Sequence, residues 1–306
     1  MNKVYLSNAL KGFLMGAANV IPGVSGGTIA FITGIYEDLI EGVKSFDLDA
    51  FNLLKQKRIK DLLDHVNAHV LIPVFLGAGI SIISLAKLLK FLFLTYPTQV
   101  WAYFFGLILA SIWFVGKTIP KVNLATIISF IVGTAIAVYI AMQVPAQEND
   151  ATWYLLICGA VAMCSMILPG LSGSFVLLLM GNYTLIMVNA ISNFDFAIIA
   201  PVGLGAVLGL LAFSHLLTYL FKNFKGSTIS LMTGFILGSL MTIWPWKNEI
   251  TDPNIVNSKG VMKVIGYDRY LPETFDGATF FAIVMVVVGI ISVYFVEKIG
   301  EKTKEA

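Results

Sequence analysis

One short motif occurs twice in this chain, each time inside an apolar segment. The first copy is Ile21-Pro22-Gly23-Val24-Ser25-Gly26-Gly27-Thr28, and the second is Leu168-Pro169-Gly170-Leu171-Ser172-Gly173-Ser174. Proline has no N–H to donate and glycine adopts backbone angles that other residues avoid, so each copy predicts a break in a helix. Inside a membrane, broken backbone is tolerated only where protein buries it or where it lines a watery cavity. Two matching breaks therefore indicate a transporter whose binding site lies at the breaks.

The motif is part of an internal duplication. In one register, first-half residues match residues 147 positions later: Gly12 with Gly159, Pro22 with Pro169, Gly23 with Gly170, Ser25 with Ser172, Gly26 with Gly173, Gly34 with Gly181 and Tyr36 with Tyr183. In the next register the offset is 128: Pro73 with Pro201, Gly77 with Gly205, Gly106 with Gly234 and Ser111 with Ser239. The difference of 19 indicates an insertion near residues 50–68, and the segments around Gly133 and Gly289 match only weakly. Registers of this length indicate two repeats.

The apolar segments predict how the repeats sit in a membrane. Only 12% of the residues are charged, against about 25% in soluble domains, so we expect a polytopic membrane protein. Each half has five apolar segments: near 8–21, 24–40, 70–94, 98–116 and 122–142, then 152–168, 171–190, 196–221, 227–246 and 279–297. This odd number makes the second half enter the membrane from the opposite side. The number of membrane crossings per half is also odd if the first two segments form a re-entrant hairpin and only the other three segments cross. A helix over 8–21 spans about 21 Å, too short for a hydrocarbon core of about 30 Å. Segment 171–190 approaches a full span and leaves both arrangements open.

The predicted fold is an all-α polytopic membrane protein with two inverted-topology repeats, residues 1–143 and 152–306. Each repeat has a re-entrant or broken helical hairpin followed by three transmembrane helices. With both termini in the cytoplasm, fourteen Lys and Arg residues lie inside and six outside, which follows the positive-inside tendency. We expect the insertion near 50–68 to form an amphipathic helix on the inner membrane surface. The polar segment 247–278 is expected outside, where it caps the entrance or only connects.

The motif residues predict an anion site. Ser25 is expected to cap the following helix and to leave the N–H groups of Gly26, Gly27 and Thr28 available for a phosphate or carboxylate. The second copy offers Ser172, Gly173 and Ser174 in the same way. Inverted repeats would bring the two tips together near the middle of the membrane. The alternative is that each copy is a tight turn packed by small residues.

Titratable residues near the apolar segments add further candidates. Glu37, next to Tyr36, either relays protons or has already reached the cytoplasmic surface. His215 lies in an apolar segment, where it titrates near neutral pH or only packs. Lys11 either attracts an anion or extends to the inner face. Asp61, His65 and His69 share helical spacing, but they indicate a solvated face rather than a metal site. Cys158 and Cys164 lie on different helix faces, which argues against a disulfide.

Several functions lack the residues that they need. The two arginines, Arg58 and Arg269, lie outside the apolar segments, so arginine clamps on phosphate inside the membrane are excluded. No catalytic triad, His/Cys metal cluster or phosphate-loop lysine is present in the sequence, which argues against an enzyme and predicts no cofactor. No basic run with interleaved aromatic residues supports nucleic-acid binding.

Taken together, these residues resemble a known family. The stretch Gly12-x3-Gly16-x2-Asn19-Val20 through Thr28, then Gly34-Ile35-Tyr36-Glu37 and the second motif, is similar to the polyprenyl-phosphate (undecaprenyl-phosphate) translocases of bacteria and archaea. The resemblance implies a cytoplasmic-membrane flippase. It would return undecaprenyl phosphate from the outer to the inner leaflet for cell-wall and surface-polymer synthesis. The second copy departs at Ser174-Phe175 and at Thr184, which replaces Glu37, so any role for an acid applies to Glu37 alone.

The resemblance and the residue chemistry lead to one mechanism. We expect Ser25–Thr28 and Ser172–Ser174 to hold the phosphate, with the prenyl tail in lipid through a lateral opening. Rocking of the hairpins around the breaks at Pro22, Gly23, Pro169 and Gly170 would alternate access, with Glu37 or His215 coupling it to protons. Accessory roles are expected for four residues: Asn19, Tyr36, Tyr183 and Lys11. The alternatives are a transporter of a small soluble anion and an enzyme acting on lipid phosphates.

Overall fold

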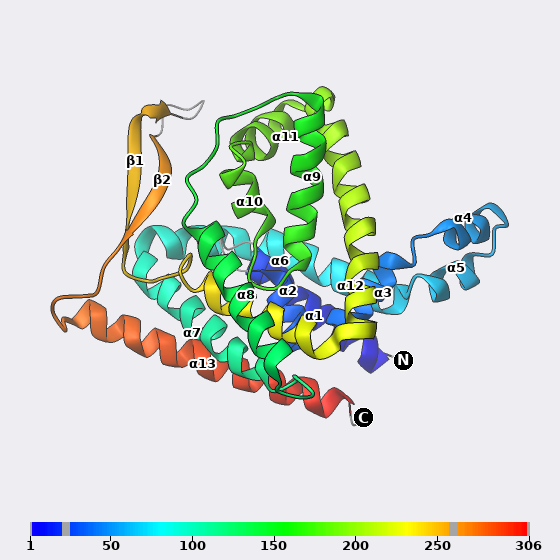
Figure 1. Ribbon diagram of the computed structural model, residues 1–306, viewed down its shortest axis with the longest axis horizontal. Helices are drawn as coiled ribbons and strands as arrows, with labels where there is room; N and C mark the ends of the chain where they lie inside the picture. Colours follow the sequence, from blue (N-terminus) through cyan, green and yellow to red (C-terminus); the bar gives the residue numbers. More distant parts are fainter. Residues whose placement is uncertain (1, 20–24, 257–261, 305–306) are drawn as a thin grey trace.

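The computed structural model describes residues 2–19, 25–256 and 262–304, and it is mostly helical (Figure 1). The first half contains α1 (Asn2–Asn19), α2 (Gly26–Ile32), α3 (Tyr36–Lys44), α4 (Leu48–Lys55), α5 (Ile59–His65), α6 (Ala68–Thr95), α7 (Pro97–Gly116) and α8 (Leu124–Ala141). The second half contains α9 (Thr152–Ile167), α10 (Gly173–Leu179), the π-helix η1 (Thr184–Ala190), α11 (Ile191–Asn193), α12 (Phe196–Ser239), β1 (Lys247–Val256), β2 (Met262–Arg269) and α13 (Gly277–Lys304). Within the described residues, five helices are long and apolar enough to cross a membrane: α6, α7, α8, α12 and α13.

Helix α12 consists of two arms joined by a sharp bend. Its 44 residues would measure about 66 Å if straight, roughly twice the hydrocarbon core. Phe224 leaves the helical conformation with φ −135° and ψ 39°, and Figure 1 shows the two arms running in different directions. The arms correspond to the apolar segments predicted near 196–221 and 227–246, although the helix already ends at Ser239.

Both motif segments are broken twice. After the motif break, α2 is separated from α3, and α10 from η1, by a glycine in the left-handed region: Gly34 with φ 70° and Gly181 with φ 79°. The two turns have the same hydrogen-bond pattern: the N–H groups of Ile35 and Asn182 each donate over 3.0 Å to the carbonyl five residues earlier. Segment 171–190 is therefore not a continuous helix, because Gly181 interrupts it.

Equivalent helices of the two halves make equivalent contacts. A Cβ added at Gly12 would lie 2.1 Å from the carbonyl oxygen of Val74, and one at Gly159 would lie 2.0 Å from that of Val202. These contacts join α1 to α6 and α9 to the first arm of α12. The same holds for the pairs that join α7 to α13 and α8 to the second arm of α12: Gly106 with Val286, Gly289 with Tyr103, Gly234 with Phe130 and Gly133 with Leu231. The segments that match weakly in sequence thus match closely in their packing.

Two parts of the chain differ from the prediction. Strands β1 and β2 form an antiparallel hairpin, with Lys247 opposite Arg269 and Thr251 opposite Val264, so the all-α prediction was wrong here. This polar segment satisfies its backbone groups by pairing with itself rather than by forming a helix. The insertion was predicted as one amphipathic helix over 50–68. It forms two short helices, α4 and α5, with Lys57 between them at φ 55°.

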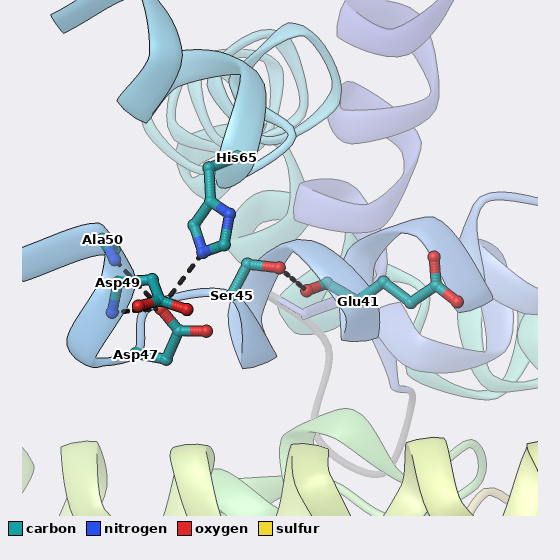
Figure 2. Close-up of polar contacts among 6 residues, drawn as sticks. All are labelled: Glu41, Ser45, Asp47, Asp49, Ala50 and His65. Carbon is teal, nitrogen blue, oxygen red and sulfur yellow. Dashed lines mark hydrogen bonds and ion pairs between the residues drawn. The ribbon is translucent and has the colours of Figure 1, made fainter. Parts of the chain in front are cut away.

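Polar contacts join the two helices of the insertion (Figure 2), together with an apolar cluster of Ala50, Val66 and Ala68. Asp47 caps α4 by accepting hydrogen bonds from the N–H groups of Asp49 (3.0 Å) and Ala50 (2.9 Å). Its carboxylate also lies 3.0 Å from Nε2 of His65 at the end of α5. In the described residues, no group of three His, Cys, Asp or Glu side chains is arranged to hold a metal ion. The contact of His65 with Asp47 joins the end of α5 to the start of α4.

Candidate functional site

The two motif copies meet in space. Ser25 Oγ donates a hydrogen bond to the carbonyl of Leu168 over 3.1 Å, and Thr28 Oγ1 accepts one from the N–H of Gly170 over 3.0 Å. Ser25 and Thr28 are 1% and 0% exposed. The matching motif copies of the two halves thus form one buried contact, which we call the tip junction. Pro22 and Gly23 lie outside the described residues, whereas Pro169 and Gly170 lie at the junction.

The N–H groups of the first tip are already occupied. Gly26 donates to Oδ1 of Asn19 over 2.8 Å, Gly27 donates to Ser25 Oγ over 3.1 Å, and Thr28 donates to the Ser25 carbonyl over 3.0 Å. Ser25 caps α2 as predicted. The expectation that these three N–H groups are available was wrong for this conformation, because the cap and the amide of Asn19 satisfy them.

The second tip is bonded differently. Ser172 makes no capping hydrogen bond to α10. Its hydroxyl instead lies 2.8 Å from that of Ser174. Among the described residues, nothing accepts from the N–H groups of Gly173 and Ser174. Met166 stands where the first half has Asn19, and a thioether is a weak acceptor. The second tip therefore presents two hydroxyl groups and two N–H groups that can bind an anion.

The junction leaves no room for larger residues. A Cβ on Gly27 would lie 2.4 Å from the carbonyl oxygen of Ile167. Gly170 has φ 85°, which L side chains rarely adopt, and its Cβ would lie 2.7 Å from the carbonyl oxygen of Phe235. The tips are in direct contact, so any ligand that binds between them must separate them.

Glu37 lies at a second contact between the halves. Its Oε1 is 2.7 Å from Nζ of Lys225, and both side chains are about half exposed (50% and 49%). Lys225 follows the bend at Phe224 in α12. Glu37 therefore connects the first turn of α3 to the bend. The sequence did not identify Lys225 as its partner.

Tyr36 packs beside this ion pair. Its ring lies 4.7 Å from that of Phe31 and 5.8 Å from that of Phe221, centroid to centroid. The side chain is 4% exposed, and its hydroxyl has no hydrogen-bond partner within the described part of the chain. Tyr36 and Glu37 thus belong to the contact with α12 rather than to the tip junction.

The remaining candidates lie on α12, on α1 and between α10 and η1. His215 is exposed on the first arm of α12, and its Nδ1 lies 2.8 Å from the carbonyl of Leu211 in the same helix. Tyr183 is half-buried and packs against a small cluster on α9 and α10. Lys11 is half-buried on α1. Asn19 is the accessory residue that the structure brings directly to a tip.

Comparison with known proteins identifies the family and confirms the resemblance. Residues 15–262 match the VCA0040-like family, described as undecaprenyl phosphate translocase-like. A polyprenyl-phosphate transporter of Vibrio cholerae is 39% identical over 97% of this chain and 98% of its own length. A polyprenyl-phosphate transporter of Staphylococcus aureus is 30% identical over 78% of this chain and 86% of its own length. No solved structure matches. The chain is a multi-pass membrane protein, and it belongs to the undecaprenyl phosphate translocase-like family.

Proposed function

We propose that this protein moves a polyprenyl phosphate, of the undecaprenyl phosphate class, from the outer to the inner leaflet of the cytoplasmic membrane. The phosphate would be held between the two tips. The observation that carries the proposal is the tip junction, in which Ser25 and Thr28 reach the second motif. The matching relatives are named polyprenyl-phosphate transporters, and this name supports the choice of substrate.

The two halves act as inverted repeats in this proposal, with both termini in the cytoplasm. The equivalent packing of α1 on α6 and of α9 on α12 supports the repeat. Each half contributes one hairpin, so one hairpin would enter the membrane from each leaflet and the tips would meet between them. Separation of the tip junction on alternate sides would admit and release the phosphate.

The tips suit a transported anion because they bind without a fixed charge. Ser172, Gly173 and Ser174 supply the first contacts, since the N–H groups of Gly173 and Ser174 have no acceptor among the described residues and the two hydroxyls bond to each other. Ser25 and Thr28 join when they exchange Leu168 and Gly170 for phosphate oxygens, and the N–H groups of Gly26 and Gly27 are the last to engage. None of these donors carries a fixed positive charge, so no ion pair holds the phosphate and its release stays fast.

Glu37 is the candidate for proton coupling. Protonation would break its ion pair with Lys225 and release α3 from the bend of α12. The test is transport as a function of a pH gradient in Glu37→Gln. A variant that keeps the full dependence would remove Glu37 from the mechanism and leave His215 as the next candidate.

The insertion has an accessory role in this scheme. Apolar side chains on α4 and the preceding turn point into solvent, with Leu48 80% and Phe51 63% exposed. Lys55, Lys57 and Arg58 lie in the same segment. Apolar and basic groups together suit the surface of an anionic membrane, so we assign α4 and α5 to the inner membrane surface.

The test of the function is transport of labelled undecaprenyl phosphate in proteoliposomes. Ser25→Ala combined with Ser172→Ala should lower the initial rate by about tenfold or more, the effect of losing roughly 1.4 kcal/mol of binding. Ser129→Ala is the matched control, because its hydroxyl donates to Ala125 of its own helix. An unchanged rate in the double variant would contradict the site. Competition by free phosphate would favour a soluble anion, and release of phosphate from the lipid would indicate an enzyme.

A further inference from the structure

A long apolar groove lies next to the first tip. A cavity of about 270 Å³ is bordered by α1, α2, α6, α7 and α13. A second cavity of about 540 Å³ continues between α6, α7 and α13. Leu89, Tyr103 and Phe104 line both cavities. We call the two together the α6–α13 groove.

The groove connects the tip to one end of the helices. Ile29 and Ile32 line its inner part, and they belong to the same short helix, α2, that begins at the tip junction. At the other end the groove is lined by Tyr96 and Phe281, next to the turn between α6 and α7 and the start of α13. From Leu85 to Tyr96 the wall of α6 extends about 16 Å. A ligand with its polar end at the tip could therefore extend its apolar part along the groove.

The chemistry of the lining restricts the ligand. The walls are aliphatic and aromatic apart from Gln99 in the outer cavity and Ser292 in the inner one, and the Ser292 hydroxyl donates to the carbonyl of Val288 in its own helix over 2.8 Å. The rings of Tyr103 and Phe104 lie edge to face, 5.1 Å apart. The described residues of these walls offer no cationic side chain and few hydrogen-bond donors to a soluble anion. They suit a flat, methyl-branched chain that packs against ring faces and edges.

The second half closes the equivalent position. Leu217 matches Leu89 at the offset of 128. Leu217 is 2% exposed and belongs to the main core, together with Phe221 and Tyr36, whereas Leu89 is half-buried and faces both cavities. The groove thus lies along α6, next to α2, whereas the matching position on α12 is buried in the core.

We propose that the α6–α13 groove holds the polyprenyl tail of the transported lipid while its phosphate lies at the tips. This inference rests on the proposed function and adds the tail site to it. Contact of the chain with Ile29 and Ile32 would tie occupancy of the groove to the position of the first hairpin. An acyl chain of an ordinary phospholipid is the competing occupant, and the experiment separates the two.

The test uses undecaprenyl phosphate that carries a diazirine on its chain, bound to the unmodified protein in phospholipid nanodiscs. Illumination should label peptides that contain Leu89, Tyr103 or Phe104, and excess unlabelled undecaprenyl phosphate should suppress the label. A diazirine phospholipid should not label these peptides at the same concentration. Equal labelling by the phospholipid, or labelling of undecaprenyl phosphate elsewhere, would overturn the tail site.

A variant gives an independent measurement. Leu89→Trp fills the groove and should weaken undecaprenyl phosphate binding by about tenfold or more, while binding of geranyl phosphate, which has two isoprene units, is unchanged. Leu94→Trp is the control, because Leu94 is 76% exposed on α6. Equal loss of both ligands in Leu89→Trp would contradict a separate tail site. If the unmodified protein binds neither ligand, the proposed function itself fails.

Discussion

The two tips have almost the same sequence and different hydrogen bonds. In the first tip every N–H from Gly26 to Thr28 has an internal acceptor. In the second, Ser172 bonds to Ser174 and the described residues leave the neighbouring N–H groups without an acceptor. The N–H groups of the first tip are satisfied internally in this conformation, whereas two N–H groups of the second tip are not satisfied within the described chain. Two copies of one motif can thus differ in the hydrogen bonds that they make.

Exchanging residues between the tips gives the largest expected effect. Gly27→Ser copies Ser174 into the first tip and drives a Cβ toward the carbonyl of Ile167, 2.4 Å away. We expect a loss of about 1–3 kcal/mol or more from overpacking and little transport. Thermal unfolding in detergent, followed by tryptophan fluorescence, measures the loss of stability. The reverse change, Ser174→Gly, should unfold at nearly the normal temperature. Equal stability of the two variants would contradict the difference in packing between the two tips.

The next effect concerns the bond that joins the tips. Thr28→Val keeps the branched shape but leaves the N–H of Gly170 without its acceptor. An unsatisfied buried donor costs about 1–3 kcal/mol, so the unfolding temperature should fall. Thr28→Ser keeps a hydroxyl and should recover most of the loss. If Val and Ser behave alike at this position, the junction does not depend on this hydrogen bond.

Two alanine variants separate stability from binding. Ser25→Ala removes a helix cap and should cost about 0.5–2 kcal/mol. Ser174→Ala lies at the second tip and should cost less than about 0.5 kcal/mol, yet lower transport more than Ser25→Ala does. The two variants should therefore rank in opposite orders for stability and for transport. Their unfolding temperatures and initial transport rates, measured side by side, test this expectation. Parallel losses in the two variants would show that the tips do not differ in function.

The smallest effect concerns the insertion, which only the first half contains. Hydrogen bonding from the Ala50 N–H holds the pKa of Asp47 below its usual value, and the His65 contact adds to this. A lowered folded-state pKa stabilises α4 above the unfolded value of about 3.9. This stability is lost as the pH falls through the folded-state pKa.

Hydrogen exchange of the α4 amides measures this effect. Protection, corrected for the intrinsic rate, should be constant from pH 8 to 5 and fall only below about pH 4. Asp47→Ala should abolish it at every pH, and Asp49→Asn is the control. Protection that falls at neutral pH would contradict the role of Asp47.

Much of this arrangement followed from the sequence. The offset of 147 related Ser25 to Ser172, and the tips do meet. The bond of Asn19 to Gly26 could not be predicted, because it depends on how the chain turns after α1. Lys225 was missed as the partner of Glu37 because 188 residues separate them. The β-hairpin was missed because its segment lacks apolar periodicity, the signal on which the helix prediction rested.

The pairing of α7 with α13 has a consequence for biosynthesis. Helix α7 buries Gly106 against Val286, so the first half cannot complete its packing until the last membrane helix has left the ribosome. Until then the surface of α7 around Gly106 has no α13 to pack against. Contacts between such distant segments form late and expose unfinished surfaces to other chains. A chain that is truncated before α13 should therefore leave the packing surface of α7 exposed.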